Sequence, residues 1–253
     1  MPLYVITGCR TGIGLEYVRQ LSRDASNTVV ALVRSLAADL SNLRAVQAQA
    51  SPGRVHILEC DVSSAASIAA LPAAIRSTLN DDSHNPSPTI DVLINNAGIL
   101  HGHTETARSL TADSLHSHMA TNVIGPALLF QALYPLFARG ARVVNVSSGL
   151  GSLQLVWDGT IPPDATPYSI SKTALNMLTV HQARQEAAAD REGAGKGLVV
   201  VCVDPGHAKT EMGGPNATTE VEDSAKGVLA LVGRLGEGDN GKFFGFTGAE
   251  VPW

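Results

Sequence analysis

The chain has 253 residues, of which 44% are hydrophobic and 16% charged, and its formal net charge is −5. This composition predicts one globular domain with a large core and excludes a disordered chain. The negative charge gives no general attraction to nucleic acid or anionic membrane, and the absence of a long uncharged apolar segment argues against a transmembrane helix.

Short apolar runs alternate with helix-compatible segments along the chain. Nearly continuous Val-rich runs, such as TVVALV at 28–33, are typical of strands buried on both faces of a parallel sheet. Alternating strands and helices predict an α/β fold, a single-domain Rossmann fold (1–253) with a doubly wound parallel sheet of about seven strands. The expected strands are 3–6, 28–33, 55–58, 92–94, 142–146, 198–203 and 242–244, and the expected helices include 15–24, 36–50, 63–79, 111–138 and 168–191.

Three segments between these elements are expected to be loops, and two of them, 149–167 and 206–221, lack clear periodicity. The polar stretch DDSHNPSPT at 81–89 is expected to be a surface loop. The segments 149–167 and 206–221 each follow a predicted strand, on the side of the sheet where α/β folds bind ligands. We expect both to be substrate-binding loops, and the alternative for 149–167 is a rigid loop packed on its own domain.

The sequence GCRTGIG at 8–14 connects the first predicted strand to the first helix. In this context Gly8 permits a sharp turn, Gly12 a close backbone approach, and Gly14 tight packing of the helix on the strand. The N–H groups at the helix start would then form an anion site, so the turn predicts phosphate binding. A tight turn without a ligand is the alternative.

Four motifs occur in order along the chain: TGCRTGIG at 7–14, NNAG at 95–98, VVNVSS at 143–148 and YSISK at 168–172. Together they resemble the short-chain dehydrogenase/reductase family over essentially the whole chain. The resemblance implies a nicotinamide cofactor with its pyrophosphate on the Gly-rich turn. The residues that we expect at the cofactor are Gly8, Arg10, Thr11, Gly12, Ile13, Gly14, Arg34, Asp61, Val62, Asn95, Ala97, Gly98, Tyr168, Lys172, Pro205, Gly206 and Thr210.

Some of these residues have structural alternatives. The resemblance places Asp61 at the adenine, whereas its position before a predicted helix also suits a cap. Asn95 is expected to line the cofactor cleft, although Asn95 and Asn96 also suit a brace between strand ends. Thr210 matches a threonine that binds the nicotinamide carboxamide or a phosphate, and its alternative is a cap for the next segment.

The end of the second predicted strand indicates which nicotinamide cofactor binds. An NAD site usually has a carboxylate there for the ribose hydroxyls, but this strand ends in Arg34. A guanidinium binds a 2′-phosphate through paired, charge-assisted hydrogen bonds. Arg34, with Arg10 as a second candidate, therefore favours NADP(H), and the alternative for Arg34 is a solvated surface arginine.

Tyr168 and Lys172 are one helical turn apart, so their side chains share a face. A nearby ammonium stabilises a phenolate, which brings a tyrosine pKa toward the working pH. By the family resemblance, Tyr168 donates the proton, Lys172 also binds the nicotinamide ribose, and Ser148 holds the substrate oxygen. Asn122 matches an asparagine that anchors a water in the proton relay, and Ser147 is the alternative serine.

The segment 149–167 is expected to wall an apolar substrate pocket through Leu153 and Trp157. With KTEMGG at 209–214 and the closing VPW, it resembles the sniffer-like and C-factor-like carbonyl reductases. His207 and Met212 are further candidates for substrate contact. His207 departs from that group, which commonly has a bulky aromatic residue there.

The chain has two H-x-H pairs and three cysteines. In the expected helix, His116 and His118 are two residues apart and diverge, and no acidic or cysteine partner completes a metal site. We therefore expect no metal. The odd number of cysteines, each in or beside an apolar run, favours reduced thiols, and no secretory signal precedes the first strand. We expect a cytoplasmic protein.

The function that these features favour is NADPH-dependent reduction of a ketone, aldehyde or quinone on an apolar small molecule, aromatic ones included. A non-catalytic NADP-sensing or signalling protein is one alternative, against which the intact Asn122, Ser148, Tyr168 and Lys172 argue. Alcohol oxidation with NAD(P) is another, and Arg34 argues against an NAD enzyme. The expected partner is a small-molecule carbonyl substrate. The family resemblance also implies association with further copies of this chain, in a homodimer or homotetramer through the helices at 111–138 and 168–191, and a monomer is the alternative.

Overall fold

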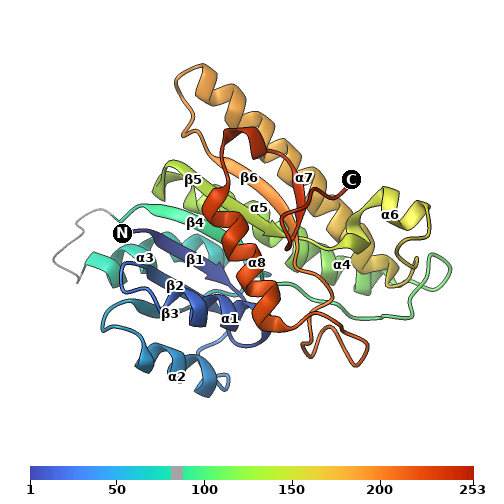
Figure 1. Cartoon of the computed structure of the whole chain (residues 1–253), viewed down its shortest axis with the longest axis horizontal. Coiled ribbons are helices and arrows are strands. Elements are labelled where there is room, and N and C mark those ends of the chain that lie inside the picture. The colour runs from blue at the N-terminus through green and yellow to red at the C-terminus, as the bar shows by residue number, and fades with distance from the viewer. Residues whose placement is uncertain (81–87) are drawn as a thin grey trace.

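Seven strands form one sheet in the order β3-β2-β1-β4-β5-β6-β7 in a computed structural model that describes residues 1–80 and 88–253 (Figure 1). Every neighbouring pair is parallel. Most of the expected loop 81–89 lies outside the described residues. The strands are β1 (Leu3–Thr7), β2 (Thr28–Val33), β3 (Val55–Glu59), β4 (Ile90–Asn95), β5 (Phe137–Val146), β6 (Val199–Asp204) and β7 (Phe243–Gly245).

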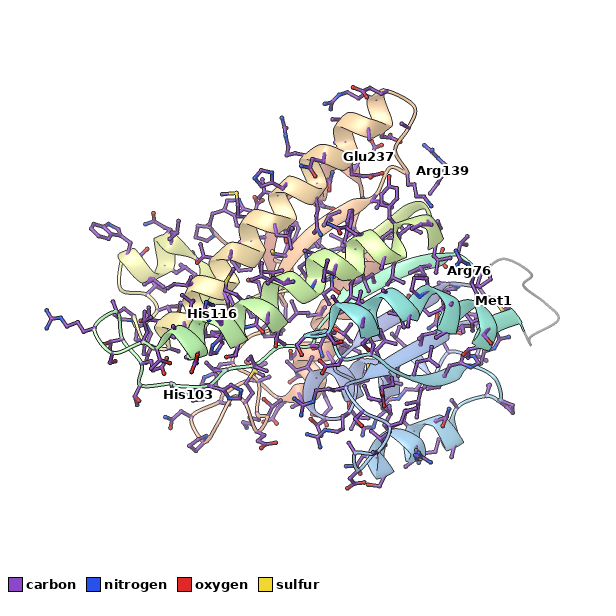
Figure 2. All side chains as sticks on the ribbon, turned by 180° about the vertical axis from the view of Figure 1, so that it is seen from behind. Met1, Arg76, His103, His116, Arg139 and Glu237 are labelled. Atoms are coloured by element: carbon purple, nitrogen blue, oxygen red, sulfur yellow. The ribbon has the colours of Figure 1, made fainter. Side chains whose placement is uncertain are left out.

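Helices cover both faces of this sheet, so the expected doubly wound Rossmann fold is confirmed. One core lies under α1, α2 and α8, and the other lies under α3, α5 and α7. Figure 1 views the face that carries α8, and Figure 2 views the opposite face. The helices are α1 (Gly12–Leu21), α2 (Ser41–Gln49), α3 (Ala65–Asn80), α4 (Ala112–Met119), α5 (Gly125–Leu133), α6 (Leu153–Trp157), α7 (Thr166–Arg191) and α8 (Val221–Arg234).

Successive residues of the central strands belong to different cores. In β2, Val29 and Ala31 belong to the core under α1, α2 and α8, whereas Val30 and Leu32 belong to the core on the opposite face. All four side chains are fully buried. This explains why the run TVVALV is apolar at every position, as expected for a strand covered by helices on both faces.

The expected helix at 111–138 is interrupted in the structure. α4 continues into a π-helical turn, η1 (Ala120–Ile124), then into α5 and a short 3-10 turn, η2 (Tyr134–Leu136). The strand β5 therefore begins at Phe137, five residues before the expected 142. Further 3-10 turns occur at η3 (Gly149–Gly151) and η4 (Glu237–Asp239). Within the described part of the chain, no helix has the length and apolarity needed to cross a membrane.

The topology fixes where a ligand can bind. β1 pairs with β2 on one side and with β4 on the other, so the connections run in opposite directions from this point. In open α/β sheets, the crevice beyond the carboxyl ends of the strands at such a reversal is the usual ligand site. The Gly-rich turn follows β1 at this position.

Candidate functional site

A cleft of about 930 Å³ lies at the carboxyl ends of the strands. Its wall is formed by the Gly-rich turn, the residues after β2, β3 and β4, the first turns of α7, and the segment from Pro205 to Glu222. The expected residues that line it are Gly8, Arg10, Thr11, Gly12, Ile13, Gly14, Arg34, Asp61, Val62, Ala97, Gly98, Tyr168, Lys172, Pro205, Thr210 and Met212.

The Gly-rich turn fits closely against the end of β4. Gly8 has a φ of +72°, and a Cβ added to it would lie 2.9 Å from Ala97 Cα. A Cβ at Gly14 would overlap the carbonyl oxygen of Gly8. Both positions therefore require glycine. The first turn of α1 contains no acidic side chain, and Thr11 makes no side-chain capping bond. The start of the helix is therefore electrostatically suited to an anion.

Asn95 does not line the cleft, contrary to the expectation. It is buried at the end of β4, where its Nδ2 donates to Asn145 Oδ1 at 2.8 Å. The cleft residue is Asn96, because neighbouring side chains of an extended chain point to opposite sides. Asn96 Nδ2 also donates to the Thr7 carbonyl at 2.9 Å, which ties the ends of β1 and β4 together. Both asparagines thus brace the sheet, in agreement with the alternative interpretation.

Two arginines that the sequence predicted at the cofactor lie in the cleft wall. Arg34 directly follows β2, and both Arg34 and Arg10 are exposed residues of the cleft wall. Hydrogen bonds from Ser41 and the weaker charge effect of Arg10 lower the pKa of Asp39, which places Arg10 near this carboxylate. Asp61 also lines the cleft, while its Oδ1 accepts from the Ser63 N–H at 2.9 Å in the turn before α3.

Tyr168 and Lys172 lie in the first two turns of α7, which has proline at its start. Both side chains are buried, at 7% and 3% exposure. Lys172 Nζ lies 5.5 Å from the centre of the Tyr168 ring and donates to the Val146 carbonyl at 2.7 Å. Burial raises the pKa of Tyr168, against a hydrogen bond from Ser148 that lowers it. Burial lowers the pKa of Lys172 to about 8, with Cys202 and Asp204 opposing.

The two serines after β5 have different partners. The Ser147 hydroxyl is buried and donates to Asn176 Oδ1 at 2.6 Å. The Ser148 hydroxyl accepts from the Leu150 N–H at 3.2 Å and lies close enough to Tyr168 to lower the pKa of the phenol. The cleft wall includes Ser147 rather than Ser148, but the Ser147 oxygen is committed to α7. Ser148 is therefore the serine with a hydroxyl beside the tyrosine.

Asn122 lies in the π-helical turn η1 and contacts the segment after β4. Its Oδ1 accepts from the Ile99 N–H at 2.9 Å, and its Nδ2 donates to the Ile99 carbonyl and to Ser171 Oγ. A Cβ at Gly98 would lie 3.3 Å from Asn122 Oδ1 and 3.7 Å from Lys172 Nζ. The structure therefore brings Asn122, Gly98 and Lys172 together.

The expectation that Leu153 and Trp157 wall the substrate pocket is wrong. Both lie on the short helix α6 with 68% and 86% of their surface exposed, and neither lines the cleft. The C-terminal residues hold α6 in this orientation: Ser152 Oγ donates to the Pro252 carbonyl, and the Gln154 N–H donates to the Trp253 carbonyl. These contacts span about one hundred residues, so local sequence does not encode them.

His207 also lies outside the cleft wall, unlike Met212. Its Nε2 donates to the Gly213 carbonyl at 2.7 Å, so the imidazole links two positions within its own loop. Gly206 is likewise outside the wall, although its neighbour Pro205 lines it. The sequence motifs did not identify a set of residues directly after NNAG that line the cleft. Their position next to that motif is the sequence feature that could have indicated them. They are Ile99, Leu100, His101 and His103.

The four histidines of the H-x-H pairs do not gather at one point, although the rings of His101 and His118 lie 5.9 Å apart. His103 lies in the loop after β4, whereas His116 projects from α4 (Figure 2). His116 is exposed and His118 is fully buried, as expected for helical residues two positions apart. In the part of the chain that the structure describes, no three His, Cys, Asp or Glu side chains form a metal-binding group.

Comparison with known proteins agrees with this geometry. A family model described as short chain dehydrogenase matches residues 3–221. The C-signal protein of Myxococcus xanthus is 36% identical over 174 residues, which cover 65% of this chain and 93% of that protein. The NADPH-bound carbonyl reductase from chicken fatty liver has a TM-score of 0.86 and 29% identity, with 100% of both chains covered. Carbonyl reductase Sniffer of D. melanogaster has a TM-score of 0.85 and 27% identity over 100% of both chains.

These similarities extend over the elements that build the cleft. The family match contains the Gly-rich turn, the NNAG segment and the helix with Tyr168 and Lys172. The structural similarity covers all seven strands. The resemblance that the four motifs indicate is therefore confirmed, including the similarity to sniffer-like carbonyl reductases. The chain belongs to the short-chain dehydrogenase/reductase family of oxidoreductases.

Proposed function

We propose that this protein is an NADPH-dependent carbonyl reductase that acts on a ketone, aldehyde or quinone group of an apolar small molecule. The observation that carries the proposal is the buried Tyr168–Lys172 pair, which opens on the same cleft as the Gly-rich turn and Arg34. One cleft thus combines an anion site, a guanidinium and a proton donor.

The residues of the cleft fit an NADP(H) molecule. The glycines allow the turn before α1 to pack closely against Ala97 and Thr210, and the acid-free first turn suits a pyrophosphate. Arg34 stands where an NAD site has a carboxylate, and its planar guanidinium suits a 2′-phosphate. The chicken carbonyl reductase, which has the same fold, binds NADPH, and this similarity supports the same cofactor here. Asp61, Val62, Ala97 and Thr210 would line the rest of its path.

When bound, NADPH supplies the hydride, and the residues of this chain supply orientation and the proton. The Ser148 hydroxyl lies close enough to Tyr168 to lower the pKa of the phenol, so one carbonyl oxygen placed between the two hydroxyls can accept from both. Such hydrogen bonds polarise the carbonyl and favour charge development on its oxygen. Tyr168 then donates its proton to this oxygen.

Lys172 makes the loss of that proton easier. Its ammonium lies 5.5 Å from the phenol ring at a buried position, where a positive charge stabilises a phenolate. Because burial alone raises the pKa of Tyr168, this stabilisation is needed for proton transfer near neutral pH. The carbonyl of Val146 holds Lys172 Nζ in place.

The substrate end of the cleft is only partly apolar. Ile99, Leu100 and Met212 provide apolar side chains there, and His101 and His103 provide imidazoles. We infer a substrate with an apolar or aromatic body, and a rim that accepts polar substituents. The segment from Pro205 to Glu222 is the proposed substrate loop, and Leu153, Trp157 and His207 have no part in the proposed substrate site.

A signalling role without catalysis is the second candidate. It is favoured by the 36% identity to a protein named C-signal. The burial of a lysine and a tyrosine beside Ser148 favours catalysis, because a protein that only senses NADP does not need a buried proton donor.

The test is turnover by the purified protein with a panel of ketones, aldehydes and quinones. We expect NADPH to be oxidised faster than NADH with at least one of them. Tyr168→Phe should abolish turnover and leave NADPH binding nearly unchanged. Tyr134→Phe is the matched control, because the Tyr134 hydroxyl bonds Glu186 away from the cleft. Normal turnover by the Tyr168 variant, or no turnover of any carbonyl by the unmodified protein, would contradict the proposal.

We also propose that copies of this chain associate through the helices around α5 and α7. Three large apolar side chains in this region are exposed: Ile124 at the end of η1, and Ile170 and Met177 on α7. Sedimentation equilibrium of the purified protein tests this, and a monomer at micromolar concentration would contradict it.

A further inference from the structure

His118 is a buried titratable residue that has no role in the proposed mechanism as described above. It lies in the last turn of α4 and has no exposed surface. Its ring stands between two other rings. The His118 centroid is 6.2 Å from that of Tyr168, at an interplanar angle of 75°, and 5.9 Å from that of His101, at 66°. Both are edge-to-face contacts, which have a preferred geometry.

Hydrogen bonds on both nitrogens fix the tautomer of His118. Nδ1 lies 2.6 Å from the Ser114 carbonyl oxygen, which can only accept, so Nδ1 carries the proton. Nε2 lies 3.2 Å from the backbone nitrogen of His101, whose N–H donates, so Nε2 is unprotonated. The imidazole is therefore neutral and held in one orientation. A proton on Nε2 would point the N–H of the ring at the N–H of His101, and neither group could accept a hydrogen bond.

His118 Nε2 also binds the backbone of the segment that forms the substrate side of the cleft. His118 and Asn122 are four residues apart, and both bind the backbone of the segment after β4, at His101 and at Ile99 respectively. These are two of the residues that line the cleft beside Tyr168. Two hydrogen bonds, one from the end of α4 and one from the turn η1, therefore attach this wall to the helical segment.

We propose that His118 is a positioning residue that places the Tyr168 ring through its own ring and the cleft wall through Nε2. The inference rests on the proposed reductase function, because it assigns Tyr168 as the proton donor. A displacement of about 1 Å in a reacting group can cost on the order of 100-fold in rate, so a fixed ring beside Tyr168 has a direct kinetic consequence. His118 touches neither substrate nor cofactor in this role.

The two contacts can be separated by substitution. His118→Gln has an amide oxygen that can accept from the His101 N–H, but it lacks the ring against Tyr168. His118→Phe retains a ring and lacks both hydrogen bonds. We expect the Gln variant to lose kcat by at least about tenfold while the carbonyl KM stays within about twofold. We expect the Phe variant to raise the carbonyl KM more than it lowers kcat. Both should bind NADPH like the unmodified protein.

The matched controls are His116→Gln and His116→Phe, on the same helix but at an exposed position (Figure 2). A Gln variant at position 118 with kcat within about twofold of its control would overturn the proposal. Equal losses of kcat in both His118 variants, with falling thermal stability, would also overturn it by indicating a purely structural role.

A second measurement does not depend on turnover or on the folding of any variant. The ¹⁵N chemical shifts of the His118 ring in the unmodified protein distinguish the three protonation forms. We expect the neutral form with the proton on Nδ1 at about pH 7. The other tautomer, or an imidazolium, would overturn the inference. If no carbonyl is reduced by the unmodified protein, the proposed function fails, and these shifts still decide whether His118 has the geometry that the inference requires.

Discussion

Replacing Lys172 by methionine is expected to abolish turnover and, at neutral pH, to stabilise the fold. Burial lowers the pKa of Lys172 from its ordinary 10.5 to about 8, so folding shifts the equilibrium toward the neutral amine relative to the unfolded chain. The protein nevertheless holds an ammonium there below that pKa. A fall of this size corresponds to roughly 3 kcal/mol of folding free energy, which the charged lysine costs at about pH 7. Methionine has a similar length and no charge.

The loss of one hydrogen bond offsets part of this gain. Lys172 Nζ donates to the buried Val146 carbonyl, and leaving that acceptor without its partner costs about 1–2 kcal/mol. We therefore expect the variant to be more stable than the unmodified protein by about 1–2 kcal/mol at about pH 7. The pH dependence is a stricter test. The hydrogen bond from Lys172 to the Val146 carbonyl changes less with pH than the charge of the amine does, so the pH dependence reports mainly the charge.

The sign of the pH dependence follows from proton binding. Between about pH 8 and pH 10.5 the unfolded chain carries a proton on Lys172 that the folded chain has lost, so the stability of the unmodified protein rises with pH in this window relative to the variant. The difference between the two should shift by about 2–3 kcal/mol from about pH 7 to pH 10. Other groups titrate there too, but they are common to both proteins.

The assay is urea unfolding of both proteins without cofactor, followed by circular dichroism at the two pH values. Lys226→Met, at an exposed position on α8, is the control and should give no such shift. A stability difference that stays constant between the two pH values would refute the reasoning, because Lys172 would then have an ordinary pKa despite its burial.

Three further outcomes are expected. Arg34→Ala should weaken NADPH binding by about 10–100-fold in a fluorescence titration and leave NADH binding almost unchanged, since charge-assisted hydrogen bonds contribute about 1.5–3 kcal/mol. Gly8→Ala should lower the melting temperature more than Gly140→Ala, because both have φ near +70° but only Gly8 would meet a neighbour. In the folded protein a thiol reagent at about pH 8 should find no reactive cysteine, because burial raises the pKa of all three thiols; a fast-reacting thiol would contradict the structure at Cys9, Cys60 or Cys202.

The parts of the fold that were predicted correctly from the sequence share one property. The residues that lie close together in them follow from the regular periodicity of a strand or a helix. The runs at 28–33 and 198–203 are apolar at nearly every position, and each forms a central strand within a residue or so of the expected bounds. Tyr168 and Lys172 face the same cleft because a helix places residues four apart on one side. In these cases the backbone geometry needs no information from distant residues.

The expectations that were wrong depend on contacts that periodicity does not report. The orientation of Leu153 and Trp157 is decided by hydrogen bonds to the last two residues of the chain. Asn95 and Asn96 are neighbours in the sequence. A shift of one position at a strand end moves a side chain from the cleft to the interior of the protein. Motif matching at such a place identifies the pair but not the member that reaches the cleft.

The π-helical turn η1 shows why some functional geometry is found only in the structure. A regular helix through 111–138 satisfies the apolar pattern equally well, so sequence gives no reason to interrupt it. The interruption lies where Asn122 binds Ile99, one turn after His118 binds His101. Wider turns of this kind are often found at functional sites. Because both side chains bind backbone atoms, their partners have no residue signature in the sequence. The wall of the cleft is thus held by two residues, of which the family motif identifies Asn122 but nothing in the sequence identifies His118.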